Sequence, residues 1–151
     1  MTDRVVAHQG AACWATLFTH AHYLPCLAVL LQSMRACQTR YPLVVMVTET
    51  VDARTRERLT RMGCVLRDVD AWRVPHADGS LAFERFQNVW TKLRAFELYE
   101  YERVVMIDSD MLMCHNMDEL FDLPLERGMI AAAFACTCNP KQIPTYPAEW
   151  T

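Results

Sequence analysis

Short apolar runs alternate along the chain with stretches in which apolar residues recur every three or four positions. The apolar runs at 12–18, 43–47 and 103–107 each predict a buried strand. The run at 43–47 is apolar throughout, as expected of a strand covered on both faces of a parallel sheet. Two further strands are predicted at 64–69 and 129–135.

Helical periodicity appears between the first strands. The segment 24–36 has apolar residues at spacings of three and four, and they form one core-facing stripe. A second helix is predicted at 52–62. Asp52 suits the N-cap of this helix, and Gly63 suits its C-terminal stop.

The second half of the chain is predicted to contain a loop and two shorter helical segments. The segment 70–86 holds a proline, a glycine and several charges, which favours a long surface loop. Asn88 is a suitable cap for a helix at 89–98, and 117–121 suits a short helical turn.

Strands that alternate with helices predict an α/β fold with a mostly parallel sheet and right-handed crossovers. The 151 residues fit a single domain, 1–151. Ligands of such sheets bind beyond the carboxyl ends of the strands. The segments that follow the strands are therefore the places to look for a site, and they are 19–20, 48–49, 68–70 and 108–110.

Composition narrows the function classes. The formal net charge of -3 offers no basic surface for nucleic acid and no polybasic patch for a membrane. The N-terminus lacks a long apolar segment of signal-peptide type, and the longest aliphatic run, 24–31, is too short to span a bilayer. Seven cysteines at irregular spacing predict core thiols in a reduced protein, so we expect a cytoplasmic location.

Two carboxylates, Asp108 and Asp110, follow the apolar strand at 103–107. On an extended backbone, residues two apart point to the same side, so both carboxylates can reach one point in space. A divalent cation would remove their mutual repulsion, and carboxylate oxygens suit Mn²⁺ or Mg²⁺. The alternative is a solvated turn with two surface acids, since turns are rich in aspartate.

Lys92 lies in the first turn of the helix predicted at 89–98. A cation is unfavourable there for the helix dipole, and this cost indicates a role such as a phosphate or sugar contact. An ordinary exposed lysine is the alternative interpretation.

A third group of candidates follows the first strand. Tyr23 could stack on a base, with the backbone near Thr19 reading its edge. The alternative is a capped helix start with a core tyrosine. His20 and His22 could ligate a metal, but no third ligand is suggested nearby.

Taken in order, these segments resemble glycosyltransferase family 8, in its glycogenin and galactinol synthase branch. The motifs that carry the resemblance are T-K-L at 91–93, an apolar strand, D-x-D at 108–110 and N-x-D-x-L-F at 116–121. The resemblance implies a GT-A fold, a UDP-sugar donor, a Mn²⁺ ion and transfer of a hexosyl group to an acceptor hydroxyl with retention of configuration.

The resemblance also implies roles for individual residues. Asp108 and Asp110 would bind the metal, and Asp108 would also face the ribose or sugar. The backbone of Ser109 would approach the ribose. Lys92 would contact the donor sugar or its phosphates. The uridine would lie at Leu17, Thr19 and Tyr23.

The chain departs from the family pattern in its second half. An Asn-x-Gly strand, an Asp-Gln segment and a His-x-x-Gly-x-x-Lys-Pro-Trp motif, which carries the third metal ligand, are absent from these 151 residues. We therefore expect an N-terminal portion of such an enzyme. A catalytically inactive nucleotide-binding remnant and a homodimer formed through an exposed sheet edge stay open. A nucleotidyltransferase is disfavoured, because no Gly-rich basic loop follows the first strand.

Overall fold

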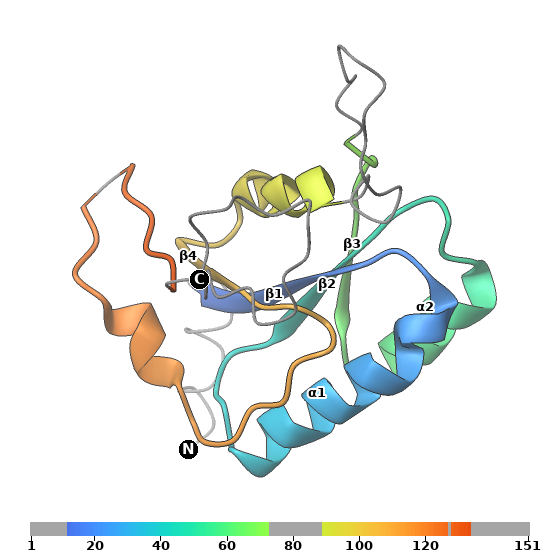
Figure 1. Ribbon diagram of the computed structural model, residues 1–151, viewed down its shortest axis with the longest axis horizontal. Coiled ribbons are helices and arrows are strands. Elements are labelled where there is room, and N and C mark those ends of the chain that lie inside the picture. The colour runs from blue at the N-terminus through green and yellow to red at the C-terminus, as the bar shows by residue number, and fades with distance from the viewer. Residues whose placement is uncertain (1–11, 73–88, 127, 134–151) are drawn as a thin grey trace, which may run out of the picture.

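The computed structural model describes residues 12–72, 89–126 and 128–133 (Figure 1). Its elements, in chain order, are β1 (Ala12–Phe18), η1 (Ala21–Tyr23), α1 (Leu24–Ala36), β2 (Leu43–Val47), α2 (Ala53–Arg61), β3 (Val65–Asp68), η3 (Val89–Glu97), β4 (Arg103–Met106) and η4 (Asp118–Asp122). The first two strands and the first helix have the bounds that the apolar pattern predicts.

The strands form one four-stranded sheet in the order β3-β2-β1-β4. Every neighbouring pair is parallel, with Trp14 opposite Leu43 and Val105 on either side of β1. The expected α/β fold with a parallel sheet is confirmed. Within the described ranges β3 and β4 are the outer strands, and pairing of two copies through such an edge stays a prediction.

Helices cover both faces of the sheet, α1 and α2 on one and η3 on the other (Figure 1). Alternate residues of β1 and β2 supply the two cores. On the α1 face Trp14, Phe18 and Val45 join the apolar stripe of α1. The opposite face is filled by Cys13, Ala15, Val44, Met46 and Leu98. The largely apolar central strands β1 and β2 are thus buried on both faces.

The predicted ends of α2 are confirmed. Asp52 is the N-cap, and its carboxylate accepts a hydrogen bond from the Thr55 amide at 2.7 Å. Gly63 follows the last turn with a φ of 88°, a left-handed conformation that glycine adopts without strain.

The helix predicted at 89–98 is present but is a 3-10 helix, η3, not an α-helix. Apolar side chains recur every three residues in this helix, and residues three apart lie on the same side of a 3-10 helix. Trp90, Leu93 and Phe96 form an exposed apolar row, and Arg94 pairs with Glu97 at 2.5 Å. The proposed cap, Asn88, and most of the loop predicted at 70–86 lie outside the described residues.

The strand predicted at 129–135 is wrong for the residues that the structure describes. Residues 129–133 are irregular, and Met129 and Ile130 are 61% and 71% exposed. An apolar run becomes a strand only when a neighbour satisfies its backbone, and no described strand lies beside this one. Residues 134 and 135 lie outside the described ranges.

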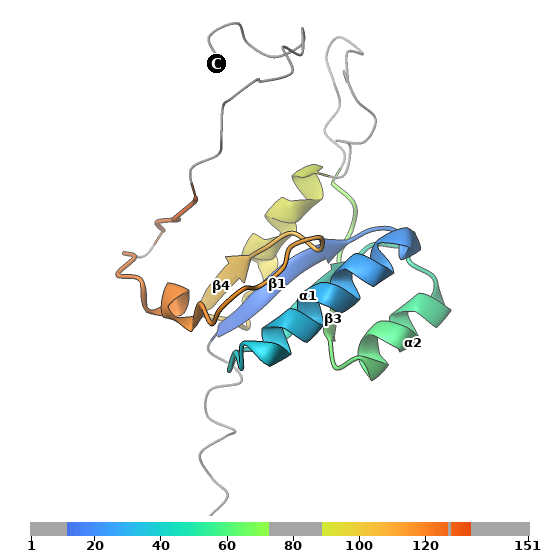
Figure 2. The ribbon, with the colours of Figure 1, turned by 60° about the horizontal axis from the view of Figure 1, so that its bottom comes forward.

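After β4 the chain turns back and runs along the α1 side of the sheet to η4 (Figure 2). Midway, the amide of Met113 donates to the Ser33 hydroxyl of α1 at 3.0 Å. At the end, Phe121 packs edge-on against Trp14, with ring centroids 5.0 Å apart. The helical turn predicted at 117–121 is confirmed one residue later. In the described ranges no helix is both long and apolar enough to cross a membrane.

Candidate functional site

The candidate residues follow parallel strands, so they lie along one edge of the sheet. β1 leads to Thr19, β2 to Glu49, β3 to Asp70 and β4 to Asp108. This edge is where ligands of parallel sheets bind. The observed parallel pairing confirms the prediction that these segments share one edge of the sheet.

Asp108 and Asp110 lie on a turn and not on an extended strand, which corrects the geometry expected from sequence. β4 ends at Met106, and the last strand-like contact is the bond from the Ile107 amide to the Ala15 carbonyl at 2.9 Å. The Met111 amide then donates to the Asp108 carbonyl at 3.3 Å. β1 continues to Phe18, but its pairing with β4 ends at Ala15 opposite Met106, so the chain leaves the sheet before Asp108.

The two carboxylates differ in their surroundings. The Asp108 side chain is 44% exposed, and its Oδ1 accepts from the Lys92 ammonium at 2.5 Å. Asp110 is exposed, and among the described residues it forms no ion pair. Ser109 between them is half-buried. The turn at 108–110 thus carries one acid with a cationic partner and one without such a partner among the described residues.

Lys92 reaches this turn from η3, which covers the face of the sheet opposite α1. Its side chain is 38% exposed and points to Asp108, sixteen positions along the chain. The ammonium thus has a specific partner in the turn, and the role of Lys92 in binding stays a prediction. The structure therefore brings Lys92 and Asp108 together, as a shared site requires.

The exit of β1 is braced by a row of threonine hydroxyls. Thr50 donates to the carbonyl of Thr19 at 2.6 Å, and its own oxygen lies 2.7 Å from the Thr48 hydroxyl. The Thr19 hydroxyl lies 2.8 Å from Nδ1 of His20. Leu17, two residues earlier on β1, is half-buried against the core on the η3 face of the sheet. The backbone at Thr19 is consequently fixed in place.

Tyr23 is not a core tyrosine. Its side chain is 39% exposed, and its ring lies 4.1 Å from that of His22. The rings of His22 and His20 are 5.4 Å apart. In the described part of the chain these histidines belong to no group of three metal-ligating side chains. An exposed aromatic cluster therefore marks the β1 exit.

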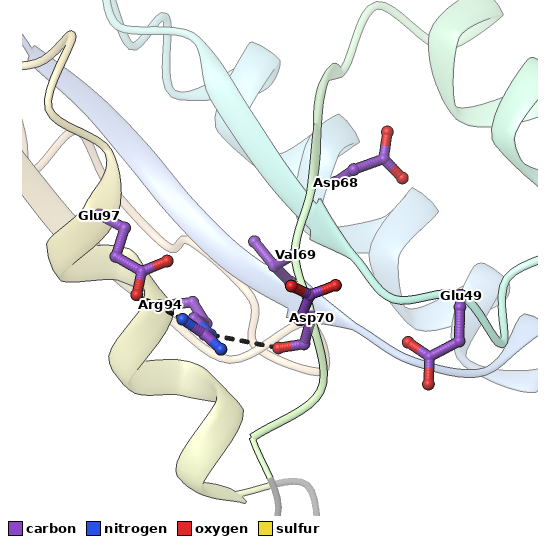
Figure 3. A pocket seen from close by; sticks show the side chains of 6 residues that line it. All are labelled: Glu49, Asp68, Val69, Asp70, Arg94 and Glu97. Atoms are coloured by element: carbon purple, nitrogen blue, oxygen red, sulfur yellow. Dashed lines mark hydrogen bonds and ion pairs between the residues drawn. The ribbon is translucent and has the colours of Figure 1, made fainter.

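A polar pocket of about 230 Å³ lies at the carboxyl ends of β2 and β3, next to η3 (Figure 3). It is lined by Glu49, Asp68, Val69, Asp70, Arg94 and Glu97. Two of its four acids have cationic partners. Arg56 pairs with Asp68 at 2.5 Å, and Arg94 pairs with Glu97.

Sequence reasoning placed 48–49 and 68–70 at the sheet edge but missed the η3 wall of this pocket. The sequence signal that could have identified this wall is the pair of opposite charges at Arg94 and Glu97, three positions apart. Arg94 also donates to the Asp70 carbonyl at 3.2 Å, which ties η3 to the segment after β3.

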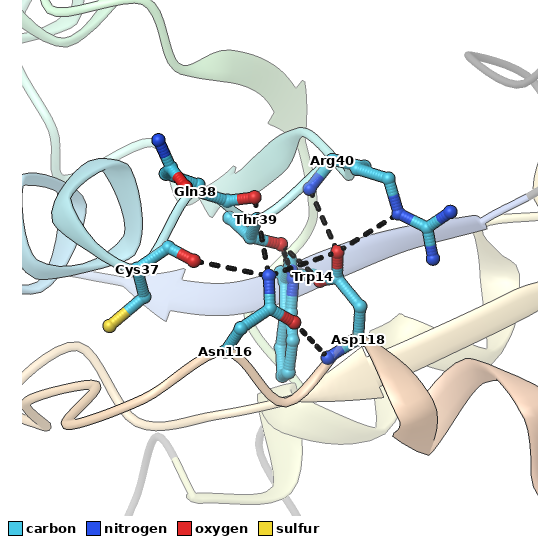
Figure 4. Close-up of polar contacts among 7 residues, drawn as sticks. All are labelled: Trp14, Cys37, Gln38, Thr39, Arg40, Asn116 and Asp118. Atoms are coloured by element: carbon cyan, nitrogen blue, oxygen red, sulfur yellow. Dashed lines mark hydrogen bonds and ion pairs between the residues drawn. The ribbon is translucent and has the colours of Figure 1, made fainter.

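We call the turn at 108–110 the acidic turn. A second polar cluster, missed by sequence reasoning, anchors residues 116–118, which follow this turn along the chain (Figure 4). Asp118 is only 4% exposed. Its carboxylate accepts from the Thr39 hydroxyl at 2.5 Å and from the Arg40 amide at 3.0 Å. Burial raises the pKa of Asp118, but the hydrogen bonds from Thr39, Arg40 and Asn116 outweigh it, so the pKa lies below its usual value.

Asn116 completes this cluster. Its amide nitrogen donates to the carbonyls of Cys37 and Gln38 at 3.1 and 3.2 Å, and its oxygen accepts from the Asp118 amide at 2.8 Å. These carbonyls lie at the end of α1, where Gln38 has a φ of 55°. The N-x-D spacing of the family-like motif was the available signal, and its role here is structural. We call Asn116, Asp118, Thr39 and Arg40 the Asp118 clamp.

The chain is similar to known transferases along most of its length. Residues 15–145 match the family model described as "Glycosyl transferase family 8". Galactinol synthase 5 of Arabidopsis thaliana is 30% identical over 139 residues, which cover 91% of this chain and 41% of that protein. Galactinol synthase 2 of Ajuga reptans is 34% identical over 110 residues, which cover 73% of this chain and 37% of the relative. The chain thus spans about two fifths of the length of these curated relatives.

Proposed function

The chain belongs to glycosyltransferase family 8, and from this premise we propose that it acts in the transfer of a hexosyl group from a UDP-sugar to an acceptor hydroxyl. Its parallel sheet with helices on both faces agrees with the GT-A fold of that family. We further propose that residues 1–151 form one nucleotide-sugar-binding unit. Galactinol synthase relatives support a polyol or a sugar as the acceptor.

The observation that carries the proposal is the acidic turn after β4. Asp108 and Asp110 offer hard oxygen donors at an accessible strand end, and the Lys92 ammonium lies beside Asp108. Such a donor set fits Mn²⁺ or Mg²⁺, which keep coordination positions for water and for substrate phosphates. A divalent ion held there would supply positive charge that stabilises the diphosphate as the sugar–phosphate bond breaks.

The other proposed contacts use residues along the same edge. Tyr23 offers an exposed ring on which the uracil can stack, and the braced backbone at Thr19 can bind its edge. Leu17 supplies an apolar floor. The backbone of Ser109 lies between the two acids and would meet the ribose. Lys92 would donate to the donor's diphosphate or sugar oxygens.

Calorimetry with UDP in the presence of Mn²⁺ tests the proposal. We expect binding by the wild-type chain that disappears with a chelator and in an Asp108→Ala, Asp110→Ala double variant. Glu119→Ala, Asp122→Ala is the matched control, since it removes two exposed acids and the same charge from η4. Equal UDP binding by the wild type and the acidic-turn variant would refute the assignment.

Turnover needs a separate test. Release of UDP from UDP-galactose or UDP-glucose, followed with and without an added polyol, measures transfer and hydrolysis. Sustained release that requires Asp108 and Asp110 supports a transferase. Binding of UDP without release supports a nucleotide-binding protein that lacks turnover.

A reducing, cytoplasmic setting is part of the proposal, and the thiols support it. The five cysteines within the described ranges are free. Burial raises the pKa of the Cys13 thiol to about 12, with a further contribution from Glu100, and burial raises the pKa of Cys64 to about 11. Such thiols stay protonated and unreactive. A disulfide found by intact-mass analysis of the purified native protein would contradict this setting.

A further inference from the structure

The Lys92–Asp108 ion pair places a cation on a carboxylate that we propose as a metal ligand. The ammonium lies 2.5 Å from Oδ1 of Asp108, and both side chains are more than one third exposed. Two cations on one carboxylate repel each other. A divalent ion that arrives at the acidic turn must therefore compete with the ammonium of the chain itself.

Lys92 can leave this partner more easily than the other cation of η3 can leave its own. Arg94 is held by the Glu97 carboxylate at 2.5 Å and by the Asp70 carbonyl at 3.2 Å. Lys92 has the single acidic partner Asp108 among the described residues, and its four-carbon stem is flexible. Once displaced from Asp108, the Lys92 ammonium at this sheet edge is available to pair with another anion.

We propose that Lys92 is the counter-ion of Asp108 in the metal-free protein and moves to the donor's diphosphate when the metal binds. This inference rests on the proposed function. The Lys92 ammonium thus couples the two ligands. The metal binds the Asp108 carboxylate, and the released ammonium binds the diphosphate of the nucleotide. Because coupling between two ligands is reciprocal, UDP strengthens metal binding and the metal strengthens UDP binding by the same factor.

Electron paramagnetic resonance of free Mn²⁺ measures this coupling without any need for turnover. Titrations are run on the wild type, Lys92→Met, Lys92→Arg and Arg94→Gln, each alone, with UDP and with uridine. Circular dichroism confirms that every variant is folded. Lys92→Arg keeps the charge, and Arg94→Gln removes one positive charge from the same helix without touching Asp108.

We expect Lys92→Met to bind Mn²⁺ about two- to fivefold more tightly than the wild type when no nucleotide is present, the scale of an exposed ion pair. The factor by which UDP strengthens Mn²⁺ binding should fall by at least as much. Lys92→Arg and Arg94→Gln should stay close to the wild type. Uridine, which has no phosphate, should give no strengthening in any variant.

Two results overturn the inference while the proposed function stands. The first is Mn²⁺ binding by nucleotide-free Lys92→Met that equals or falls below that of the wild type. The second is an equal gain in Arg94→Gln, which would indicate a general charge effect. A wild-type chain that binds no Mn²⁺ even with UDP would instead refute the proposed function itself.

Discussion

The acidic turn, 108–110, and the N-x-D segment, 116–118, lie eight positions apart and both place polar side chains two residues apart. In 116–118 the chain satisfies its own polar groups, because Asp118 is buried and accepts from Thr39 and Arg40. In 108–110 it does not, because Asp110 is exposed and Asp108 has Lys92 as its only described cationic partner. The same spacing thus yields a structural anchor in one place and accessible carboxylates in the other.

The difference shows what decides the fate of a carboxylate. A buried charge is tolerated only when the protein supplies hydrogen bonds, and such a group then stabilises the fold. A carboxylate left at an accessible strand end retains its capacity for a ligand. Stability and binding are therefore expected to separate cleanly between the two segments.

The largest expected effect is on ligand binding at the acidic turn. Asp110→Asn should weaken Mn²⁺-dependent UDP binding by about 100-fold, since it removes the charge of a proposed metal ligand. The free energy of unfolding should change by less than about 0.5 kcal/mol, because the side chain is exposed. Calorimetry and urea denaturation measure the two quantities. A large loss of stability with unchanged binding would make this turn a second structural clamp.

The reverse pattern is expected at the Asp118 clamp. Asp118→Ala should lower the free energy of unfolding by about 3 kcal/mol, because it leaves buried donors of Thr39 and Arg40 without an acceptor. Asp122→Ala, an exposed acid of the same helical turn, serves as the control and should change stability by less than about 0.5 kcal/mol. UDP affinity, measured well below the unfolding temperature, should change little.

A smaller effect is expected midway between the two segments. Ser33→Ala removes the acceptor of the Met113 amide and should cost about 1 kcal/mol in urea denaturation. Because the acidic turn lies before this contact, UDP affinity should fall by less than about threefold, which is under 1 kcal/mol. A loss as large as that in Asp110→Asn would show that the return segment positions the metal ligands.

The smallest effect concerns pH. The pKa of Asp118 is lower in the folded chain than its ordinary value near 3.9, so its bonds stabilise the fold above that value. This stability is lost as the pH falls from about 4 through the folded pKa. Urea denaturation of the wild type and of Asp118→Asn between about pH 3 and 6 should show a steeper acid decline in the wild type. If the free energy of unfolding fell equally with pH in both proteins, the acid decline would not come from the Asp118 carboxylate.

Local sequence patterns predicted those parts of the fold that local physics controls. The bounds of β1, α1 and β2 follow from apolar periodicity, and the Asp52 cap follows from its position before the helix. The parallel sheet follows from alternation of strands and helices. These features depend on neighbours within a few positions or on one-sided burial.

The features that sequence reasoning missed depend on distant partners. The irregular path of 129–133 and the turn at 108–110 lie where no pairing with a described strand is present, and the apolar pattern did not reveal this. The 3-10 geometry of η3 was also missed. The Asp118 clamp joins groups 78 and 79 positions apart. The Lys92–Asp108 pair joins η3 to the turn after β4 across 16 positions. No periodicity encodes such contacts.

A crystal structure of the protein with UDP and Mn²⁺, with anomalous scattering used to locate manganese, tests the central claim most directly. We predict one manganese peak about 2.1 Å from carboxylate oxygens of both Asp108 and Asp110, with the Lys92 ammonium turned from Asp108 to the diphosphate. A manganese peak in the pocket beside Glu49 and Asp70, with the Lys92–Asp108 pair intact, would contradict it.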